Sequence, residues 1–150
     1  MPKMLEGRGD FLSDATKLAI ESLSANEEGF FLMIEGSQID WGGHDNDAEY
    51  LISELIDFDN TIGIALDFAK LDGETLVIVT ADHETGGFTL ASDERGDYNS
   101  IKPVFSTDGH SATMVPVFAK GPGASNFGGI KSSLNWNNTT NKKRYEWNNP

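Results

Sequence analysis

The sequence predicts an α/β fold in which part of a mostly parallel central sheet is flanked by helices. Three short apolar runs, 29–34, 74–81 and 114–119, have the length and composition of strands that are covered on both faces. Between the first two runs, the apolar residues of segment 47–70 recur at spacings of three and four, the period of an amphipathic helix. Strand, helix and strand in this order are typical of a right-handed crossover between parallel strands.

The first predicted element is a helix over residues 10–24, with Ser13 as its N-cap. Its apolar face is expected to consist of Ala15, Leu18, Ala19 and Leu23. The polar run 25–28 ends this helix. The continuously apolar run Gly29–Ile34 then predicts a buried strand.

The second predicted helix is long and amphipathic, and it ends at Leu71-Asp72-Gly73. The apolar residues that set its period are Ala48, Leu51, Ile52, Leu55, Ile56, Ile62, Ala65, Leu66 and Ala69. We expect a bend near residues 59–63. The run 74–81 follows and is rich in β-branched residues, which favours a strand.

The remaining elements are shorter. Segment 84–100 is polar and rich in turn residues, with a short strand expected at 87–90. The apolar run 114–119 contains Pro116, which indicates an edge strand or a bulge. From residue 131 onward the composition changes to Asn, Thr and Lys without a clear period. We therefore divide the chain into a domain of residues 1–130 and an atypical tail of residues 131–150, which we expect to be disordered or foreign to the domain.

The composition limits the partners and the chemistry. The 150 residues carry a formal charge of −13, from 24 acidic and 11 basic residues, so neither nucleic acid nor an anionic membrane surface is an expected partner. Clustered carboxylates are instead compatible with cation binding. Because the chain has no cysteine, disulfides and thiol catalysis are excluded, and a transition metal would have to be bound by His, Asp and Glu.

Each of the three histidines lies next to a predicted loop. His44 follows Asp40 at a spacing of four, which would direct both side chains from one helical turn toward a single ion. His83 is adjacent to Asp82 and directly follows the run 74–81, and His110 precedes the third apolar run. Ligands bind at the carboxyl ends of strands in open parallel sheets, and imidazole with carboxylate is a good donor set for zinc.

Ordinary explanations exist for each of these patterns taken singly. An acid four residues before a histidine often arises by chance, and His110 alone would be read as a loop histidine. Ser37 and Ser111 are candidate nucleophiles, but neither lies in a G-x-S-x-G context. The combination is what predicts a metal site, because none of the three histidines lies on a purely helical face.

Three ordered segments carry a family resemblance: "FFLMIEGSQIDWGGHDNDA", "LVIVTADHETGGFTL" and "STDGHSATMVPVFAKGPGASNFGG". In order and spacing they resemble the metal-binding segments of bacterial alkaline phosphatases, and the likeness extends from about Leu12 to Gly129. The resemblance implies an α/β sandwich around a large, mostly parallel sheet. It also implies hydrolysis of phosphate monoesters through a phosphoserine intermediate, with two zinc ions and one magnesium ion as cofactors.

The resemblance also implies individual ligands. These are Asp40, His44 and His110 for the first zinc ion, Asp82 and His83 for the second, and Glu35 for the magnesium ion. For the full-length protein it implies a periplasmic or secreted location and allows a homodimer. Trp41, next to Asp40, either faces the substrate pocket or packs at the base of the loop.

Several functional groups of the family have no counterpart in this sequence. We find no nucleophilic serine, no aspartate that bridges the second zinc and the magnesium, and no Thr or Ser magnesium ligand. None of Arg8, Arg95 and Arg144 matches the context of the family's phosphate-binding arginine. The helix expected after residues 126–129 is replaced by the Asn-rich tail. The chain is therefore interpreted as the carboxyl-terminal part of an alkaline phosphatase domain, truncated on its N-terminal side, with Met1 as an internal or artificial start.

This interpretation carries two further expectations. The isolated chain should be inactive, and it should be marginally stable or aggregate because apolar surface is left uncovered. Two alternative functions remain. One is another hydrolase of the superfamily, such as a sulfatase, a phosphodiesterase or a phosphoglycerate-mutase relative. The other is a non-catalytic metal-binding remnant.

Overall fold

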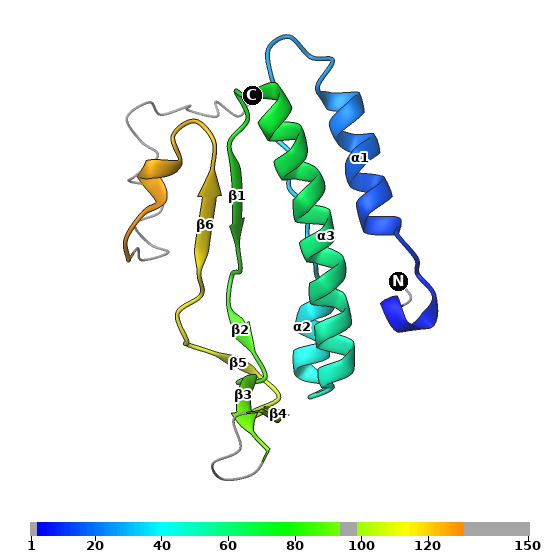
Figure 1. The fold of residues 1–150 in the computed structure, drawn as a ribbon, viewed down its shortest axis with the longest axis vertical. Helices are drawn as coiled ribbons and strands as arrows, with labels where there is room; N and C mark the ends of the chain where they lie inside the picture. The colour runs from blue at the N-terminus through cyan, green and yellow to red at the C-terminus, as the bar shows by residue number, and fades with distance from the viewer. Residues whose placement is uncertain (1–2, 94–98, 131–150) are drawn as a thin grey trace, which may run out of the picture.

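The computed structural model describes residues 3–93 and 99–130. Three α-helices lie to one side of short strands, and the smaller hairpins lie at the end of the molecule where α2 is found (Figure 1). The elements in chain order are η1 (Met4–Glu6), α1 (Phe11–Leu23), α2 (Gln38–His44), α3 (Ala48–Asp72), β1 (Val77–Thr80), β2 (Glu84–Thr85), β3 (Thr89–Ser92), β4 (Ile101–Val104), β5 (His110–Ser111), β6 (Val117–Lys120) and η2 (Ala124–Phe127). The tail 131–150 and Arg95 lie outside the described residues.

Helix α3 is the longest element and confirms the helix predicted from the apolar period. The side chain of Asp47 accepts a hydrogen bond from the backbone N–H of Tyr50 at 3.0 Å, which caps the first turn. At the other end Gly73 adopts a left-handed φ of 78°, which ends the helix at little steric cost. The helix continues without interruption through residues 59–63, where a bend was expected.

Helix α1 packs on α3 through a face that the sequence did not predict. Its buried residues are Ser13, Thr16 and Ile20, whereas Leu18 is 67% exposed. Ser13 is not the N-cap either, because the helix begins at Phe11 after Asp10. The Ser13 hydroxyl lies 3.1 Å from the Thr61 hydroxyl of α3. Small polar side chains that pair with one another let the two helices approach closely. This contact, and not the apolar period of α1, determines which face of α1 is buried.

The predicted mostly parallel sheet is not formed by the described residues. They form three two-stranded antiparallel pairs, β1 with β6, β2 with β5 and β3 with β4. The segment 29–34, predicted as a strand, is extended but forms no strand pair with any described strand. The chain nevertheless runs in the same direction through 29–34 and β1, and α3 returns between them (Figure 1).

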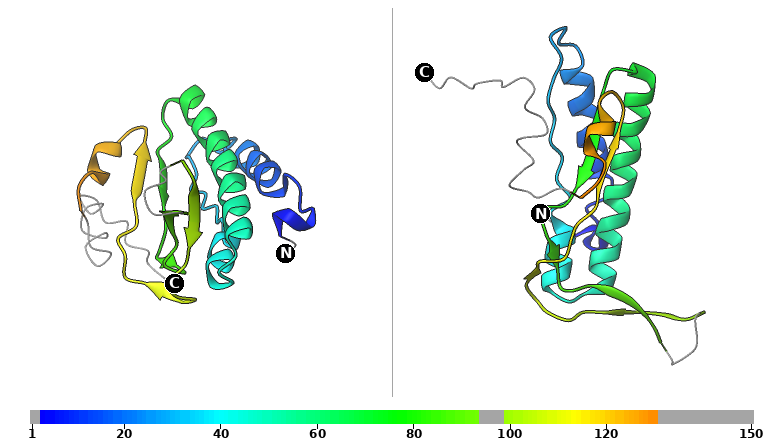
Figure 2. Two further views of the ribbon diagram at one scale, coloured as in Figure 1. Left: turned by 60° about the horizontal axis from the view of Figure 1, so that its bottom comes forward. Right: turned by 90° about the vertical axis from the view of Figure 1, so that its left-hand side faces the viewer.

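The other predicted strands are present with shifted boundaries. The run 74–81 becomes β1, and the run 114–119 becomes β6, which starts only after Pro116. The short strand expected at 87–90 is β3, shifted toward the carboxyl end. The β3–β4 hairpin projects from the end of the molecule at which α2 lies (Figure 2).

The strands are less covered than the sequence predicted: β1, β6 and the segment 29–34 each have exposed apolar side chains, and every residue of β3 and β4 is exposed. Phe30 contacts Phe68 of α3 with 6.1 Å between ring centroids, so one side of the extended segment packs on the helix. Phe31 and Met33, on the other side of this segment, are 88% and 78% exposed, and Phe118 of β6 is 62% exposed. None of the described helices has the length and apolar character needed to cross a membrane.

Candidate metal centre

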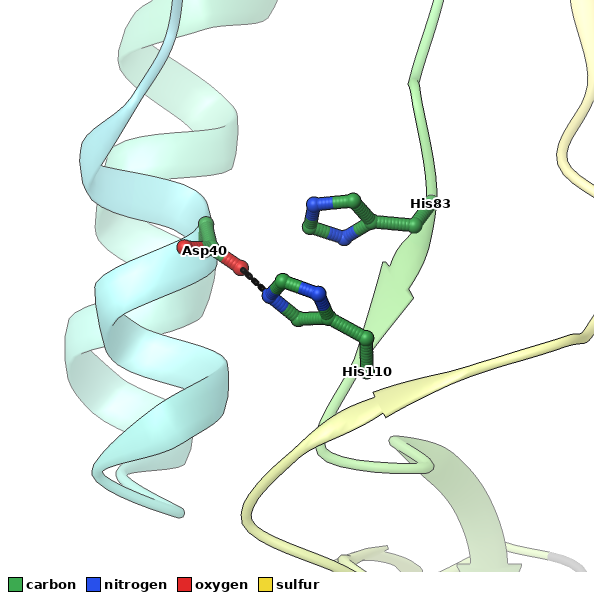
Figure 3. A group of neighbouring side chains, drawn as sticks. All are labelled: Asp40, His83 and His110. Atoms are coloured by element: carbon green, nitrogen blue, oxygen red, sulfur yellow. Dashed lines mark ion pairs between the residues drawn. The ribbon is translucent and has the colours of Figure 1, made fainter.

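Three predicted ligands from separate elements converge in the structure. Asp40 lies on α2, His83 lies between β1 and β2, and His110 begins β5. Each offers one donor atom, and these atoms all lie within 4.8 Å of one another. Figure 3 shows the three side chains directed toward one another, with the ion pair between His110 and Asp40 drawn as a dashed line. Asp40 and His83 are partly buried and His110 is exposed.

Helix α2 orients the first acid–imidazole pair as its spacing predicted. The four-residue separation places His44 Nε2 3.4 Å from Asp40 Oδ2. His44 Nδ1 lies 2.6 Å from the backbone carbonyl oxygen of Asp108. A carbonyl can only accept, so Nδ1 carries the proton and Nε2 presents its lone pair to the cluster.

The third imidazole completes this group. His110 Nε2 lies 3.2 Å from His44 Nε2 and 3.7 Å from Asp40 Oδ1. Two ring nitrogens that both present lone pairs at this distance would repel each other, so a proton or a cation must lie between them. One carboxylate and two imidazoles are a donor set that zinc accepts, with a fourth position left open. These three residues therefore fit a zinc ion.

The second acid–imidazole pair lies beside the first. Asp82 Oδ2 is 3.2 Å from His83 Nε2, and Asp82 Oδ1 accepts the backbone N–H of His83 at 3.1 Å. The imidazole rings of His83 and His110 stack with centroids 3.6 Å apart. The Asp82 side chain is 86% exposed, so this pair opens to solvent while the first is more enclosed.

Thr85 lies inside this cluster and was not identified from the sequence. Its hydroxyl donates to Asp40 Oδ1 at 2.5 Å and lies 3.2 Å from His83 Nδ1. A threonine after an Asp-His-Glu run gives no sequence signal of its own, because its partner Asp40 is 45 residues away along the chain.

Other predicted residues lie apart from these donors or have other partners. Glu35 is exposed just before α2 and does not belong to the group of converging donor atoms. Trp41 is 57% exposed, with its ring centroid 6.2 Å from that of His44, so it flanks the site and does not pack at the base of a loop. The Ser111 hydroxyl donates to Glu84 and is not free to act as a nucleophile.

The fold and the cluster define an α/β protein with a candidate metal site next to its strands. The sequence profile of the alkaline phosphatase family matches residues 1–103. The chain therefore belongs to the alkaline phosphatase family, which confirms the resemblance noted in the sequence.

Known relatives agree with this assignment. Alkaline phosphatase 3 of Bacillus subtilis (strain 168) is 50% identical over 101 residues, which cover 66% of this chain and 21% of the relative. Alkaline phosphatase 4 of the same organism is 44% identical over 110 residues, 73% of this chain and 24% of the relative. This chain thus spans between a fifth and a quarter of the length of these relatives.

Solved structures support an alkaline-phosphatase-like α/β fold. The alkaline phosphatase from the Antarctic bacterium TAB5 is 65% identical with a TM-score of 0.81, over 85% of this chain and 38% of that chain. A cold-active alkaline phosphatase from a Shewanella species has a TM-score of 0.83 at 24% identity, over 93% of this chain and 52% of that chain, which concerns the fold alone.

Proposed function

We propose that this chain supplies the metal-binding part of an alkaline-phosphatase-type enzyme that hydrolyses phosphate monoesters. The observation that carries the proposal is the convergence of donor atoms from Asp40, His83 and His110 within 4.8 Å. Family membership makes a phosphatase a better interpretation of this cluster than a sulfatase or a phosphodiesterase.

The metal assignment is the one that the family resemblance implies. The group of converging donor atoms contains His83 and not His44, whereas His44 Nε2 lies 3.2 Å from His110 Nε2. Asp40, His44 and His110 hold one zinc ion, and Asp82 and His83 contribute to a second. Glu35 contributes to a magnesium ion; a solved variant of the TAB5 enzyme has Mg bound in the M3 site. Zinc, when bound, supplies charge stabilisation for the attacking and leaving oxygens of phosphoryl transfer.

In this proposal, residues of this chain orient the metal ligands. Asp108 fixes the tautomer of His44 through its carbonyl oxygen, so that the ring does not have to lose a proton to bind metal. The exposed side of the Asp82–His83 pair leaves room for a substrate phosphate. None of its serines matches the family's nucleophile, so we expect the isolated chain to show no turnover.

Zinc titration of the full 150-residue chain by calorimetry tests the metal assignment. We expect at least one site, which His110→Ala removes. The exposed helix carboxylate Asp59 supplies a control, since Asp59→Asn should leave binding unchanged. Failure of the wild-type chain to bind zinc would reject the proposed function.

A chimera tests the reaction. Residues 12–129 would replace the matching segment of Bacillus subtilis alkaline phosphatase 3, and hydrolysis of p-nitrophenyl phosphate would be measured with zinc and magnesium present. We expect activity that Asp82→Asn and His83→Ala abolish. Turnover that survives both changes, or a preference for a sulfate ester or a phosphodiester, would show the assignment to be wrong.

A further inference from the structure

Thr85 is the side chain that links the two acid–imidazole pairs. Its hydroxyl lies within hydrogen-bonding distance of both Asp40 in the first pair and His83 in the second. It also pairs with His110 in the antiparallel register of β2 and β5. Thr85 is partly buried and belongs to the two-residue strand β2. It therefore contacts both acid–imidazole pairs and lies opposite the third histidine.

The contacts of the Thr85 hydroxyl with Asp40 and His83 favour one arrangement of protons. Ionised Asp40 can only accept, so the one hydroxyl proton of Thr85 goes to Asp40 Oδ1. The hydroxyl oxygen must then accept from His83, which places a proton on Nδ1 of that ring. Nε2 of a neutral His83 ring is then left with its lone pair, the form that binds a metal. Because Asp82 Oδ2 lies 3.2 Å from Nε2, Asp82 and Thr85 compete for the ring proton in the metal-free chain, and the Thr85 hydroxyl favours the Nδ1–H form.

We propose that Thr85 is a positioning residue that fixes the Asp40 carboxylate and the His83 tautomer together and so couples the two metal sites. This inference rests on the proposed function, since it concerns metals that Asp40 and His83 would bind. A threonine suits the role because its β-branched side chain has few accessible χ1 rotamers, so the hydroxyl direction is set by the backbone.

Two glycines allow the Thr85 backbone to approach helix α2 closely. A Cβ atom at Gly43 of α2 would lie 2.9 Å from the Thr85 carbonyl oxygen and 3.0 Å from its Cβ. A Cβ atom at Gly86 would lie 2.7 Å from the Gly43 carbonyl oxygen. The helix and the strand therefore meet backbone to backbone, and this approach brings the Thr85 hydroxyl to Asp40.

The test compares Thr85→Val, which keeps the shape and removes the hydroxyl, with Thr85→Ser, which keeps the hydroxyl. Zinc affinity is measured by calorimetry on the full chain, and the His83 tautomer by nitrogen-15 NMR of the metal-free chain. We expect the valine variant to bind zinc about 10- to 100-fold more weakly, the range seen when a group behind a metal ligand is removed. It should also lose the preference for a proton on His83 Nδ1, while the serine variant retains both properties.

Thr89→Val on the exposed strand β3 is the matched control and should change neither property. Circular dichroism checks that each variant remains folded, and Thr85→Ala replaces the valine variant if that one does not. An unchanged tautomer, or equal losses in the valine and serine variants, would overturn the inference. Absence of zinc binding in the wild type would instead reject the proposed function, and the tautomer would still decide the role of Thr85.

Discussion

Tyr50 gives the protein a dependence on alkaline pH that arises from one side chain. It is 2% exposed, and its hydroxyl donates to Gln38 Oε1 at 2.5 Å. Burial raises the pKa of Tyr50 above its ordinary value of 10.0, and the negative charges of Glu54 and Asp45 raise the pKa further. The folded state therefore holds this proton more tightly than the unfolded state does.

The sign of the linkage follows from this shift. Stability from Tyr50 is fully present below pH 10 and is lost as the pH rises toward the raised pKa of the folded state. We expect the thermal midpoint to fall as the pH rises above 10 and Tyr50→Phe to reduce that fall, at a cost of about 1 kcal/mol for the lost hydrogen bond. Equal slopes for the two proteins would show that another group is responsible.

Arg8, near the start of the chain, forms ion pairs with two buried carboxylates of α3. Its Nη2 donates to Glu54 Oε2 at 2.5 Å and to Asp57 Oδ2 at 2.7 Å, and both acids are 3% exposed. Burial alone would lower the pKa of Arg8, but the hydrogen bonds to Glu54 and Asp57 and their charges raise the pKa overall. The backbone N–H of Met4 also donates to Glu54, so this group fastens η1 to α3.

Loss of Arg8 should therefore be more damaging than its single charge indicates. Arg8→Met leaves two unpaired buried carboxylates, which costs about 3–5 kcal/mol. We expect this variant to be largely unfolded without denaturant when helix content is followed by circular dichroism. The triple variant with Glu54→Leu and Asp57→Leu should regain helix content, because the charges disappear together; failure to regain it would mean that the ion pairs are required for folding.

At the scale of single residues, spacing along the chain was informative where chemistry is local. Asp40 and His44 were identified because one helical turn separates them, and Asp82 and His83 because they are adjacent after an apolar run. Thr85 was missed because its role depends on the approach of β2 to α2. Arg8 was considered only to reject it as the family's phosphate-binding arginine. Its structural role was missed because nothing in the sequence connects it with two acids on α3, the nearer of which is 46 residues away.

At the scale of elements, helices were more predictable than strands for a physical reason. A helix makes its hydrogen bonds within one segment, so the period and caps of α3 were visible in the sequence. A strand needs a partner, and the run 29–34 has the composition of a strand without a paired neighbour among the described residues. The inward face of α1 was mispredicted because contact with α3 selected Ser13 and Thr16 for the interface, and not the apolar Leu18.

Gly43 and Gly63 lie in helices, and their substitution by alanine compares the effect of helix propensity with that of tertiary packing. A Cβ at Gly63 of α3 meets nothing within 4 Å, so Gly63→Ala should stabilise the protein by about 0.5–1 kcal/mol. Gly43→Ala gains the same propensity in α2 but drives a methyl group into the Thr85 backbone. We expect the Gly43 variant to be less stable in thermal unfolding and weaker in zinc binding; improvement of both variants alike would show that α2 and β2 can separate freely.

At the scale of the whole molecule, several large apolar side chains in and beside the strands are uncovered. Phe31, Met33 and Phe118 are 88%, 78% and 62% exposed, and Met114 is 78% exposed. Exposed apolar surface promotes association, whereas a formal charge of −13 opposes it. The sequence predicted strands covered on both faces, whereas the structure leaves these apolar side chains exposed. The extent of association therefore depends on whether apolar contact or charge repulsion is larger.

We expect association to prevail at physiological salt, because charge repulsion is screened beyond about 8 Å while apolar contact is not. Sedimentation velocity should show concentration-dependent self-association that increases with salt. Phe31→Lys combined with Phe118→Lys should reduce it, while the double variant Leu18→Lys and Leu71→Lys, which adds the same charge at exposed helix positions, should not. If both double variants reduce it equally, net charge alone controls association. A monomer that unfolds in urea in a single steep transition would show that the exposed apolar side chains do not limit stability.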